Sequence, residues 1–294
     1  MDTDRIERVR EFNRYYTRHL GVLTDRYLGQ DRPLGQARLL FEIGAGSDVR
    51  ELRERLGLDS GYLSRLLRAL TDQKLITVRA HPADRRVRIA ELTAAGHAER
   101  AELDRRSAAG IAELLDRLTD GQRDQLLDAQ ARIRRLLRTA ALTVEPVPAG
   151  DPAARDCLHR YAAELATRFP EGYDPATITA ADQVDGTTLL AREDGRPAGC
   201  GLWIHLAPRI AEIRHLWVAP PARGLGLGRR LLHALEADAA AHGVSIVRLG
   251  THAALTEAIE LYRRGGYRQI AGYSDSVYNQ LAFEKTLGQS SQSS

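Results

Sequence analysis

The sequence has few of the residues that hold disulfide-rich or metal-binding domains together. Its 294 residues include two cysteines, one methionine and 5% aromatic residues. Cys157 and Cys200 are far apart in the chain, so we expect buried, reduced thiols in a cytoplasmic protein, with no disulfide framework and no metal site. No apolar run approaches the roughly 20 residues that span a bilayer. The charged start, MDTDRIERVREF, is not typical of a signal peptide, so we expect no membrane association.

Lysine is also scarce, since Lys74 and Lys285 are the only two, and nearly all positive charge is therefore carried by arginine. Residues 1–138 carry 27 Lys+Arg against 22 Asp+Glu, which is +5, and the remainder carries 15 against 17, which is −2, for a total of +3. The basic first half permits a nucleic-acid partner without establishing one. The length of the chain predicts two globular domains. We place them at residues 1–139 and 140–288, divided at the junction TAALT, and expect the tail, 289–294, to be disordered.

The first half has the pattern of a helix-turn-helix. A first amphipathic helix is followed by a second in LGQARLLFEIG, after Pro33. A short helix then ends at Gly57, and Asp59 or Ser60 can cap the next one. That next helix is expected to enter the major groove of DNA. The apolar positions of the first helix are Ile6, Val9, Phe12, Tyr16, Leu20 and Leu23. The residues left on the outside of the DNA-reading helix are Ser60, Tyr62, Ser64, Arg65 and Arg68.

A basic hairpin follows this helix directly. Alternation in residues 76–78 and 87–89 predicts two strands joined by the turn HPADRR. A hairpin in this position is a wing that can place Arg85 and Arg86 in the minor groove. The first half, residues 5–138, resembles the MarR-type winged-helix regulators, whose D-x-R wing motif Asp84 and Arg86 match. The resemblance implies a homodimer built from the first and last helices.

The last helices of this half carry apolar stripes of their own, and a partner subunit is the natural place to bury them. A dimer would read a double-stranded operator that is an inverted repeat, with half-sites about one helical turn apart. The alternative is a helical domain whose arginines only solvate its surface. The stripes consist of Ile111, Leu114, Leu115 and Leu118, and of Leu126, Leu127, Ile133, Leu136 and Leu137.

The stretch VAPPARGLGLGRRLL, residues 218–232, has three glycines at alternate positions before a helical pattern. The dinucleotide fingerprint G-x-G-x-x-G does not fit, because its third glycine position falls on an arginine or a leucine. A P-loop does not fit either, because no lysine is near. The motif R-x-x-G-x-G does fit, with Arg223, Gly226 and Gly228. Backbone N–H groups of such a loop, together with the N-terminus of the next helix, can hold a pyrophosphate.

With AIELYRRGGY further downstream, residues 142–287 resemble the GNAT acetyltransferases. Alternating runs predict strands in TVEPVPAGD, TTLLARED, PAGCGLWIHL, AEIRHLWVAP, VSIVRLGTH, YRQIAGY and NQLAFEKTL, with helices in PAARDCLHRYAAELATRF, after the glycine loop and in LTEAIELYRRGGY. The resemblance implies an α/β fold with a mixed central sheet, acetyl-CoA as acetyl donor and an unidentified amine as acceptor. The cofactor-binding residues that it implies are Leu216, Trp217, Val218, Arg223, Gly224, Leu225, Gly226, Leu227, Gly228 and Arg229.

Acetyl transfer needs a neutral amine, a donor for the carbonyl oxygen and a proton for the departing thiolate. Tyr262 matches the tyrosine that protonates the thiolate in many members of the family. Glu212 is our first choice of general base and His215 the second. Strand alternation predicts that Arg214 and Leu216 share a face with Glu212, while His215 points the other way.

Each of these residues has a structural alternative. Tyr262 could be a core tyrosine, and Glu212 could form only an ion pair with Arg214. Leu255 stands where the family commonly has an asparagine that contacts the CoA arm, with Thr251 and His252 nearby as substitutes.

The favoured reading is a homodimeric MarR-type regulator that also acetylates an amine. A second hypothesis is a GNAT domain that senses acetyl-CoA without turnover and biases DNA binding. A third is an acetyltransferase whose winged helix docks a protein partner.

Overall fold

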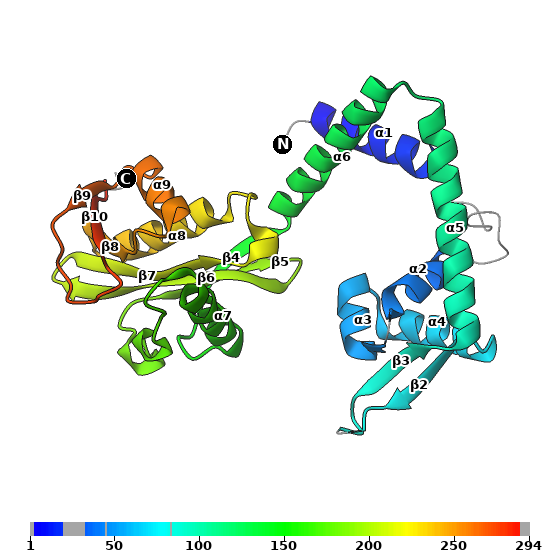
Figure 1. Ribbon diagram of the computed structural model, residues 1–294, viewed down its shortest axis with the longest axis horizontal. Coiled ribbons are helices and arrows are strands. Elements are labelled where there is room, and N and C mark those ends of the chain that lie inside the picture. The colour runs from blue at the N-terminus through cyan, green and yellow to red at the C-terminus, as the bar shows by residue number, and fades with distance from the viewer. Residues whose placement is uncertain (1–2, 20–32, 45, 83, 289–294) are drawn as a thin grey trace. The chain divides into compact units, whose positions relative to one another are not determined.

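Figure 1 shows the computed structural model of the chain, which describes residues 3–19, 33–44, 46–82 and 84–288. The chain divides into two compact units, residues 1–125 and 126–294. This division falls inside one helix, whereas the sequence predicts a boundary after residue 139, at the end of that helix. The predictions for Leu20, Leu23 and the tail 289–294 concern residues outside the described part.

The N-terminal unit combines helices with a small antiparallel sheet of order β1-β3-β2, in which the hairpin β2–β3 is the predicted wing. The two-residue strand β1 has no counterpart in the sequence analysis. The described elements are α1 (Thr3–His19), α2 (Leu34–Ile43), β1 (Ser47–Asp48), α3 (Val49–Leu56), α4 (Ser60–Asp72), β2 (Ile76–Ala80), β3 (Arg88–Leu92), α5 (Ala94–Asp116) and the start of α6 (Asp120–Ala140).

Capping residues set the ends of the two helices of the helix-turn-helix. The Asp48 carboxylate accepts from the first-turn N–H groups of α3, and α3 ends at Gly57, whose φ of 62° is left-handed. Asp59, rather than Ser60, caps α4 by accepting from the Tyr62 N–H at 2.8 Å. The apolar stripe of α4 packs into one core with α2, α3 and the sheet, and the buried residues of that stripe are Leu63, Leu66, Leu67 and Leu70.

The long helix α5 starts directly after the wing. Thr93 caps it by accepting from the Gly96 N–H, and its hydroxyl donates to the Lys74 carbonyl at 2.7 Å. A Cβ at Gly96 would lie 2.0 Å from the Leu75 carbonyl oxygen, so only glycine lets the helix approach β2 this closely.

Helices α1 and α6 have apolar stripes but no buried residue. The stripes therefore lack the burial that normally stabilises an amphipathic helix. The exposed apolar residues of α1, α5 and α6 are Ile6, Val9, Phe12, Tyr15, Tyr16, Ile111, Leu127, Ile133, Leu136 and Leu137.

The C-terminal unit is built on a mixed seven-stranded sheet of order β4-β5-β6-β7-β8-β10-β9, in which only β7 and β8 run parallel. The predicted α/β class and the order of elements are confirmed. The elements are β4 (Leu142–Val147), α7 (Pro152–Arg168), the short helical turns η2 (Pro175–Thr177) and η3 (Ala181–Gln183), β5 (Thr188–Glu193), β6 (Arg196–Ala207), β7 (Ile210–Val218), η4 (Pro220–Ala222), α8 (Leu227–Ala241), β8 (Ile246–Thr251), α9 (Thr256–Arg264), β9 (Arg268–Ile270) and β10 (Leu281–Thr286).

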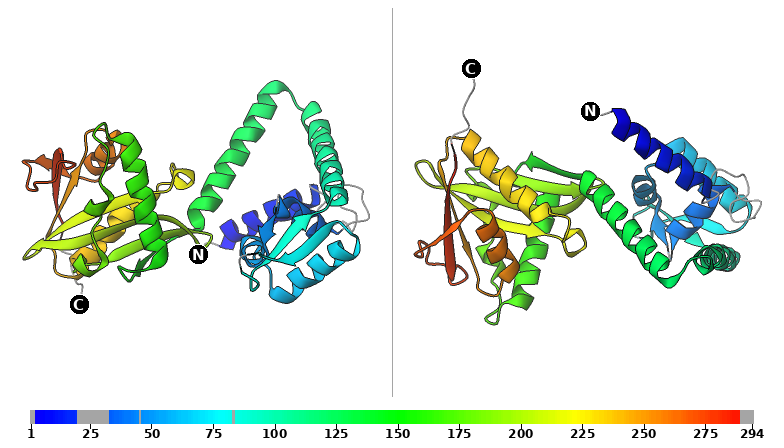
Figure 2. Two further views of the ribbon diagram at one scale, coloured as in Figure 1. Left: turned by 60° about the horizontal axis from the view of Figure 1, so that its bottom comes forward. Right: turned by 90° about the horizontal axis from the view of Figure 1, so that it is seen from above.

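Helices cover both faces of this sheet. Leu189 and Ala191 pack in the core cluster that contains α8 and α9, whereas Leu190 between them packs in the cluster with α7. Figure 1 shows α7 on one side of the sheet and α8 on the other, and the two views of Figure 2 bring each side forward in turn. Cys157 and Cys200 are both buried, free thiols in the α7 cluster.

None of the helices in the described residues is long and apolar enough to cross a membrane. The same residues contain no group of His, Cys, Asp or Glu side chains that could hold a metal ion.

Candidate functional site

The glycine loop joins β7 to α8 and alternates between buried leucine and exposed glycine. Leu225 and Leu227 are 8% and 1% exposed and anchor the loop in the core. Gly224 and Gly226 have φ angles of 77° and 79°, in the left-handed region that favours glycine. Gly226 is the N-cap of α8 and brings no capping side chain, so the first-turn N–H groups of the helix can bind an anion.

The two arginines of this loop differ in their surroundings. The Arg223 guanidinium donates to the Val218 carbonyl at 3.0 Å and to Glu164 of α7 at 2.5 Å, so it ties the loop to β7 and α7. Arg229 lies exposed on the first turn of α8. Of the two, Arg223 is the one that already pairs with a carboxylate.

Glu164 is the centre of a polar network that the sequence analysis missed. Its Oε2 also accepts from the Trp217 indole N–H at 2.9 Å, and Arg168 lies 3.4 Å from its other oxygen. Burial alone would raise the pKa of Glu164, but the hydrogen bonds from Trp217 and Arg223 outweigh it and hold the pKa below its usual value. Arg168 also pairs with Glu257 at the start of α9, so polar and charged groups link β7, α7, α9 and the glycine loop.

Beside the loop, β7 and β8 separate. Their parallel pairing covers only Ile210, Ala211 and Glu212 of β7, although β7 continues to Val218 and β8 to Thr251. The backbone of Leu216–Val218, which the resemblance implies is cofactor-binding, therefore borders the gap between the two strands. Such an edge can offer N–H and C=O groups to an extended ligand, although the Val218 carbonyl already accepts from Arg223.

A β-bulge at His215 changes which residues face each side. His215 has a φ of 54°, and the register between β6 and β7 shifts at this point. Ile213 packs with the α8 cluster, yet Trp217 packs with the α7 cluster, so alternation reverses at the bulge. The prediction that Leu216 shares a face with Glu212 was therefore wrong, since Leu216 packs with the α8 cluster.

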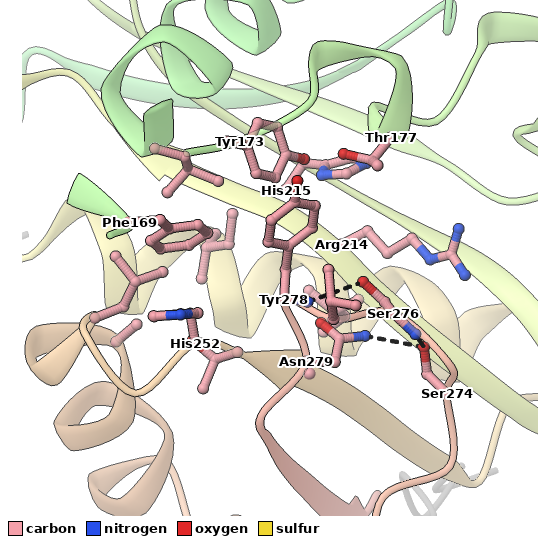
Figure 3. A pocket seen from close by; sticks show the side chains of 18 of the residues that line it. Phe169, Tyr173, Thr177, Arg214, His215, His252, Ser274, Ser276, Tyr278 and Asn279 are labelled. Atoms are coloured by element: carbon pink, nitrogen blue, oxygen red, sulfur yellow. Dashed lines mark hydrogen bonds between the residues drawn. The ribbon is translucent and has the colours of Figure 1, made fainter. Parts of the chain in front are cut away.

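A cavity of about 440 Å³ lies where the strands separate, between β7, β8, α7, α9 and the segment before β10. Figure 3 shows its side chains from close by. Of the predicted site residues, it brings together Glu212, His215, Leu216 and Tyr262, and Leu255 also lines it. Trp217, Val218 and the glycine loop do not line it.

Tyr262 enters this cavity from α9 and is 6% exposed. Its ring lies 6.0 Å from those of Tyr267 and Phe283. Burial, helped by the charge of Glu257, raises the pKa of Tyr262 well above the ordinary value, so the phenol stays protonated at neutral pH. A protonated phenol beside the cavity can donate to a departing thiolate.

Both candidate bases already have partners. Glu212 is 2% exposed; its Oε2 lies 2.5 Å from the Arg214 guanidinium and its Oε1 accepts from the Tyr273 hydroxyl at 2.9 Å. The His215 Nε2 accepts from the Thr179 N–H at 3.0 Å. Burial, with the charges of two arginines, lowers the pKa of His215 to about 3, which makes it a neutral ring and a weak base.

The residues predicted to contact DNA lie together on the N-terminal unit. Ser60, Tyr62, Ser64, Arg65 and Arg68 all lie on the exposed face of α4, and the Arg65 guanidinium lies over the Tyr62 ring at 5.7 Å.

The wing keeps its two predicted arginines exposed. Arg85 and Arg86 lie at its tip, where the Asp84 carboxylate accepts from the Arg86 N–H at 2.9 Å and tightens the turn. Arg79, by contrast, is paired with Glu91 across the hairpin at 2.6 Å.

Comparisons with known proteins divide the chain in the same way. The model of the Acetyltransferase (GNAT) family matches residues 155–267, and that of the MarR family matches residues 30–87. A curated "IAA acetyltransferase" of Azospirillum brasilense is 39% identical over 80 residues, which are 27% of this chain and 52% of the relative. An "Aminoalkylphosphonate N-acetyltransferase" of Salmonella typhimurium is 38% identical over 66 residues, 22% of this chain and 43% of the relative. The chain thus spans about half the length of the curated relatives that it matches.

Among solved structures, an acetyltransferase of the GNAT family from Staphylococcus aureus Mu50 is similar with a TM-score of 0.42 and 16% identity. The match covers 50% of this chain and all of the other. GNAT acetyltransferases use acetyl-CoA as the acetyl donor. The chain therefore joins a MarR-family region, residues 30–87, to a GNAT acetyltransferase-family domain over residues 155–267.

Proposed function

We propose that the C-terminal unit transfers the acetyl group of acetyl-CoA to an amine. The observation that carries this proposal is the position of the left-handed glycine loop. It lies at the N-terminus of α8, next to two strands that separate over a cavity containing the buried, protonated Tyr262. The N–H groups of the loop would hold the pyrophosphate, and the edge of Leu216–Val218 that β8 leaves unpaired would pair with the pantetheine arm.

In this proposal the nitrogen of a neutral amine attacks the thioester carbon, and the tetrahedral intermediate then loses the thiolate, which takes the proton of Tyr262. The proton of the amine leaves through water toward Glu212. Two nitrogens of Arg214 contact the Oε2 of that carboxylate, at 2.6 and 2.5 Å, whereas Oε1 accepts from the Tyr273 hydroxyl and has a further lone pair that can accept from a water molecule. Glu212 therefore remains the proposed base, and His215 is the weaker candidate because its ring nitrogen is already used.

Calorimetric titration of acetyl-CoA into the full chain tests the cofactor site. Gly226→Ala places a methyl group where the pyrophosphate is expected, and Gly243→Ala is a matched control. Both glycines have left-handed φ angles, 79° and 84°, and a Cβ at either meets nothing within 4 Å. The backbone strain is therefore similar, and only Gly226→Ala should abolish binding. Equal affinity of the two variants would contradict the proposed site.

Thiol release tests turnover, and Tyr262→Phe should slow it without changing the affinity for acetyl-CoA. The second candidate function, a domain that senses acetyl-CoA without turnover, is favoured by the engaged state of both bases. It predicts that acetyl-CoA shifts DNA affinity, that no amine is acetylated, and that Tyr262→Phe has no effect.

For the N-terminal unit we propose binding to double-stranded DNA as a homodimer. The supporting observations are the exposed polar face of α4, the exposed wing arginines, and the apolar stripes of α1 and α6 that nothing in the described residues buries. Sedimentation should give a dimer, and Phe12→Glu together with Leu136→Glu should shift it toward monomer.

Binding to an inverted-repeat duplex should weaken steeply with salt, because phosphate contacts release counterions. Arg86→Ala should weaken it, whereas Arg79→Ala, in the same hairpin but already paired with Glu91, should weaken it less. Binding to a protein partner with no DNA affinity would instead favour the docking hypothesis.

A further inference from the structure

One wall of the cavity is formed by aromatic rings from three separate segments. Phe169 stacks on His252 at 4.0 Å between ring centroids and on Tyr278 at 5.8 Å, and Tyr173 meets Tyr278 at 4.8 Å. We call these four residues the aromatic wall, and all of them line the cavity. In Figure 3 they gather in one part of the cavity, and the guanidinium of Arg214 extends away from them.

The polar edges of these rings are occupied, which fixes the rings in place. The Tyr278 hydroxyl accepts from the Asp174 N–H at 3.0 Å. The His252 Nδ1 accepts from the Ala254 N–H at 3.0 Å, and its Nε2 lies 2.9 Å from a Glu171 oxygen. Both ring nitrogens of His252 are therefore engaged by neighbouring groups. These hydrogen bonds hold the rings of Tyr278 and His252 in place.

The charge around the cavity is unfavourable to an anion. Arg214 is the only cationic side chain among the described residues that line it, and Glu212 already pairs with it at 2.5 Å. His215 is neutral because burial lowers its pKa to about 3. Asp275, by contrast, is an exposed lining carboxylate with no ion pair or hydrogen bond among the described residues. The cavity can thus attract an ammonium, but it has no free cation for a carboxylate or phosphonate.

We infer that the acceptor is a primary amine on a short alkyl chain attached to an aromatic ring, without any anionic group. This inference rests on the proposed acetyl transfer. The acceptor's ring would stack against the aromatic wall, and its nitrogen would point toward Tyr262, which lines the same cavity. A cavity of about 440 Å³ suits a body of this size. Ring faces also attract the incoming ammonium before it loses its proton.

A matched set of amines tests the inference. Binding of 2-phenylethylamine, 2-cyclohexylethylamine and phenylalanine to the full chain is measured by calorimetry, with and without saturating CoA. The first two differ only in whether the ring is aromatic. We expect 2-phenylethylamine to bind about two- to tenfold more tightly than its saturated analogue, the range that aromatic pairing adds beyond buried area. Phenylalanine should bind about tenfold more weakly or worse, because its carboxylate finds no free cation.

Two variants of one residue separate stacking from packing. Tyr278→Phe keeps the ring and loses only the contact with Asp174, so the preference for the aromatic amine should persist. Tyr278→Leu removes the ring, and the preference should fall toward one. Equal binding of the two ring amines to the unaltered chain, or tighter binding of phenylalanine, would overturn the inference.

The same measurements separate failure of the inference from failure of the proposed function. If aliphatic amines are acetylated without preference for an aromatic ring, the transferase function stands and the inference falls. If acetyl-CoA does not bind but 2-phenylethylamine does so with the expected preference, the cavity is an aromatic-amine site and the transferase function falls.

Discussion

The contribution of the Glu212–Arg214 ion pair to stability can be measured by removing the charge of Arg214. Arg214→Met keeps the length of the side chain and removes its charge, so a carboxylate that is 2% exposed loses its counter-charge. Removing one partner of a buried pair costs about 3–5 kcal/mol. Here the Arg214 side chain is 37% exposed, and the Tyr273 hydroxyl still donates to Glu212 at 2.9 Å. We therefore expect the free energy of unfolding to fall by about 2–3 kcal/mol.

Urea unfolding followed by tryptophan fluorescence measures this loss in the full chain. Trp203 and Trp217 are the only tryptophans, and both belong to the C-terminal unit, so the signal reports that unit alone. The double variant Glu212→Gln/Arg214→Met should recover most of the loss, because a neutral amide needs no counter-charge.

Two results would refute this reasoning. A loss below about 0.5 kcal/mol in Arg214→Met would mean that the pair contributes no more than an ordinary surface contact. Strictly additive losses in the double variant would mean that the two side chains act independently. Either outcome would mean that Arg214 does not stabilise the buried Glu212 carboxylate to the extent that the geometry suggests.

Three further predictions concern other parts of the chain. Because the pKa of His215 is lowered to about 3 from 6.5, the unfolded chain takes up a proton that the folded one does not. The free energy of unfolding of the C-terminal unit should therefore fall as the pH drops from 6.5 toward 3, by up to about 1.4 kcal/mol per pH unit, and His215→Gln should reduce that slope. In Gly96→Ala the new Cβ would meet a carbonyl oxygen at 2.0 Å, so the melting temperature of the N-terminal unit, followed by the helical circular dichroism signal, should fall. Gly110 lies in open space on the same helix, so Gly110→Ala should raise the free energy of unfolding by about 1 kcal/mol. The two buried cysteines should not react with a thiol reagent until urea unfolds the C-terminal unit, and a fast reaction of the native chain would contradict their burial.

The features that the sequence predicted well are those encoded by local pattern. Asp59 before an apolar helical stripe predicted a cap, and the structure has that cap. The alternation of glycine and leucine in residues 224–228 predicted a loop with an exposed backbone, and Leu225 and Leu227 are buried while Gly224 and Gly226 are left-handed. Such patterns can be read from the sequence because each depends on neighbours a few residues away.

The aromatic wall could not be predicted in this way. Phe169 and Tyr173 lie in the segment that follows α7, His252 follows β8, and Tyr278 precedes β10, so only the folded sheet brings the rings together. The segment RFPEGYDP contains Phe169 and Tyr173, and the segment SDSVYNQ contains Tyr278. No local sequence pattern indicates that these two segments line the same cavity.

The wrong prediction that Leu216 shares a face with Glu212 in β7 has a more specific cause, and that cause also bears on the proposed chemistry. Period-two alternation assumes a regular strand, and a single left-handed residue, His215 with a φ of 54°, breaks it. The same bulge turns Trp217 toward Glu164 and leaves His215 against Thr179. It also lies just past the last β7–β8 pair at Glu212, where the strands separate and the cavity opens. A non-glycine residue holds this backbone conformation at a cost of about 1 kcal/mol or more. In the proposed function, binding of an extended cofactor arm to the edge that the bulge leaves unpaired would offset this cost.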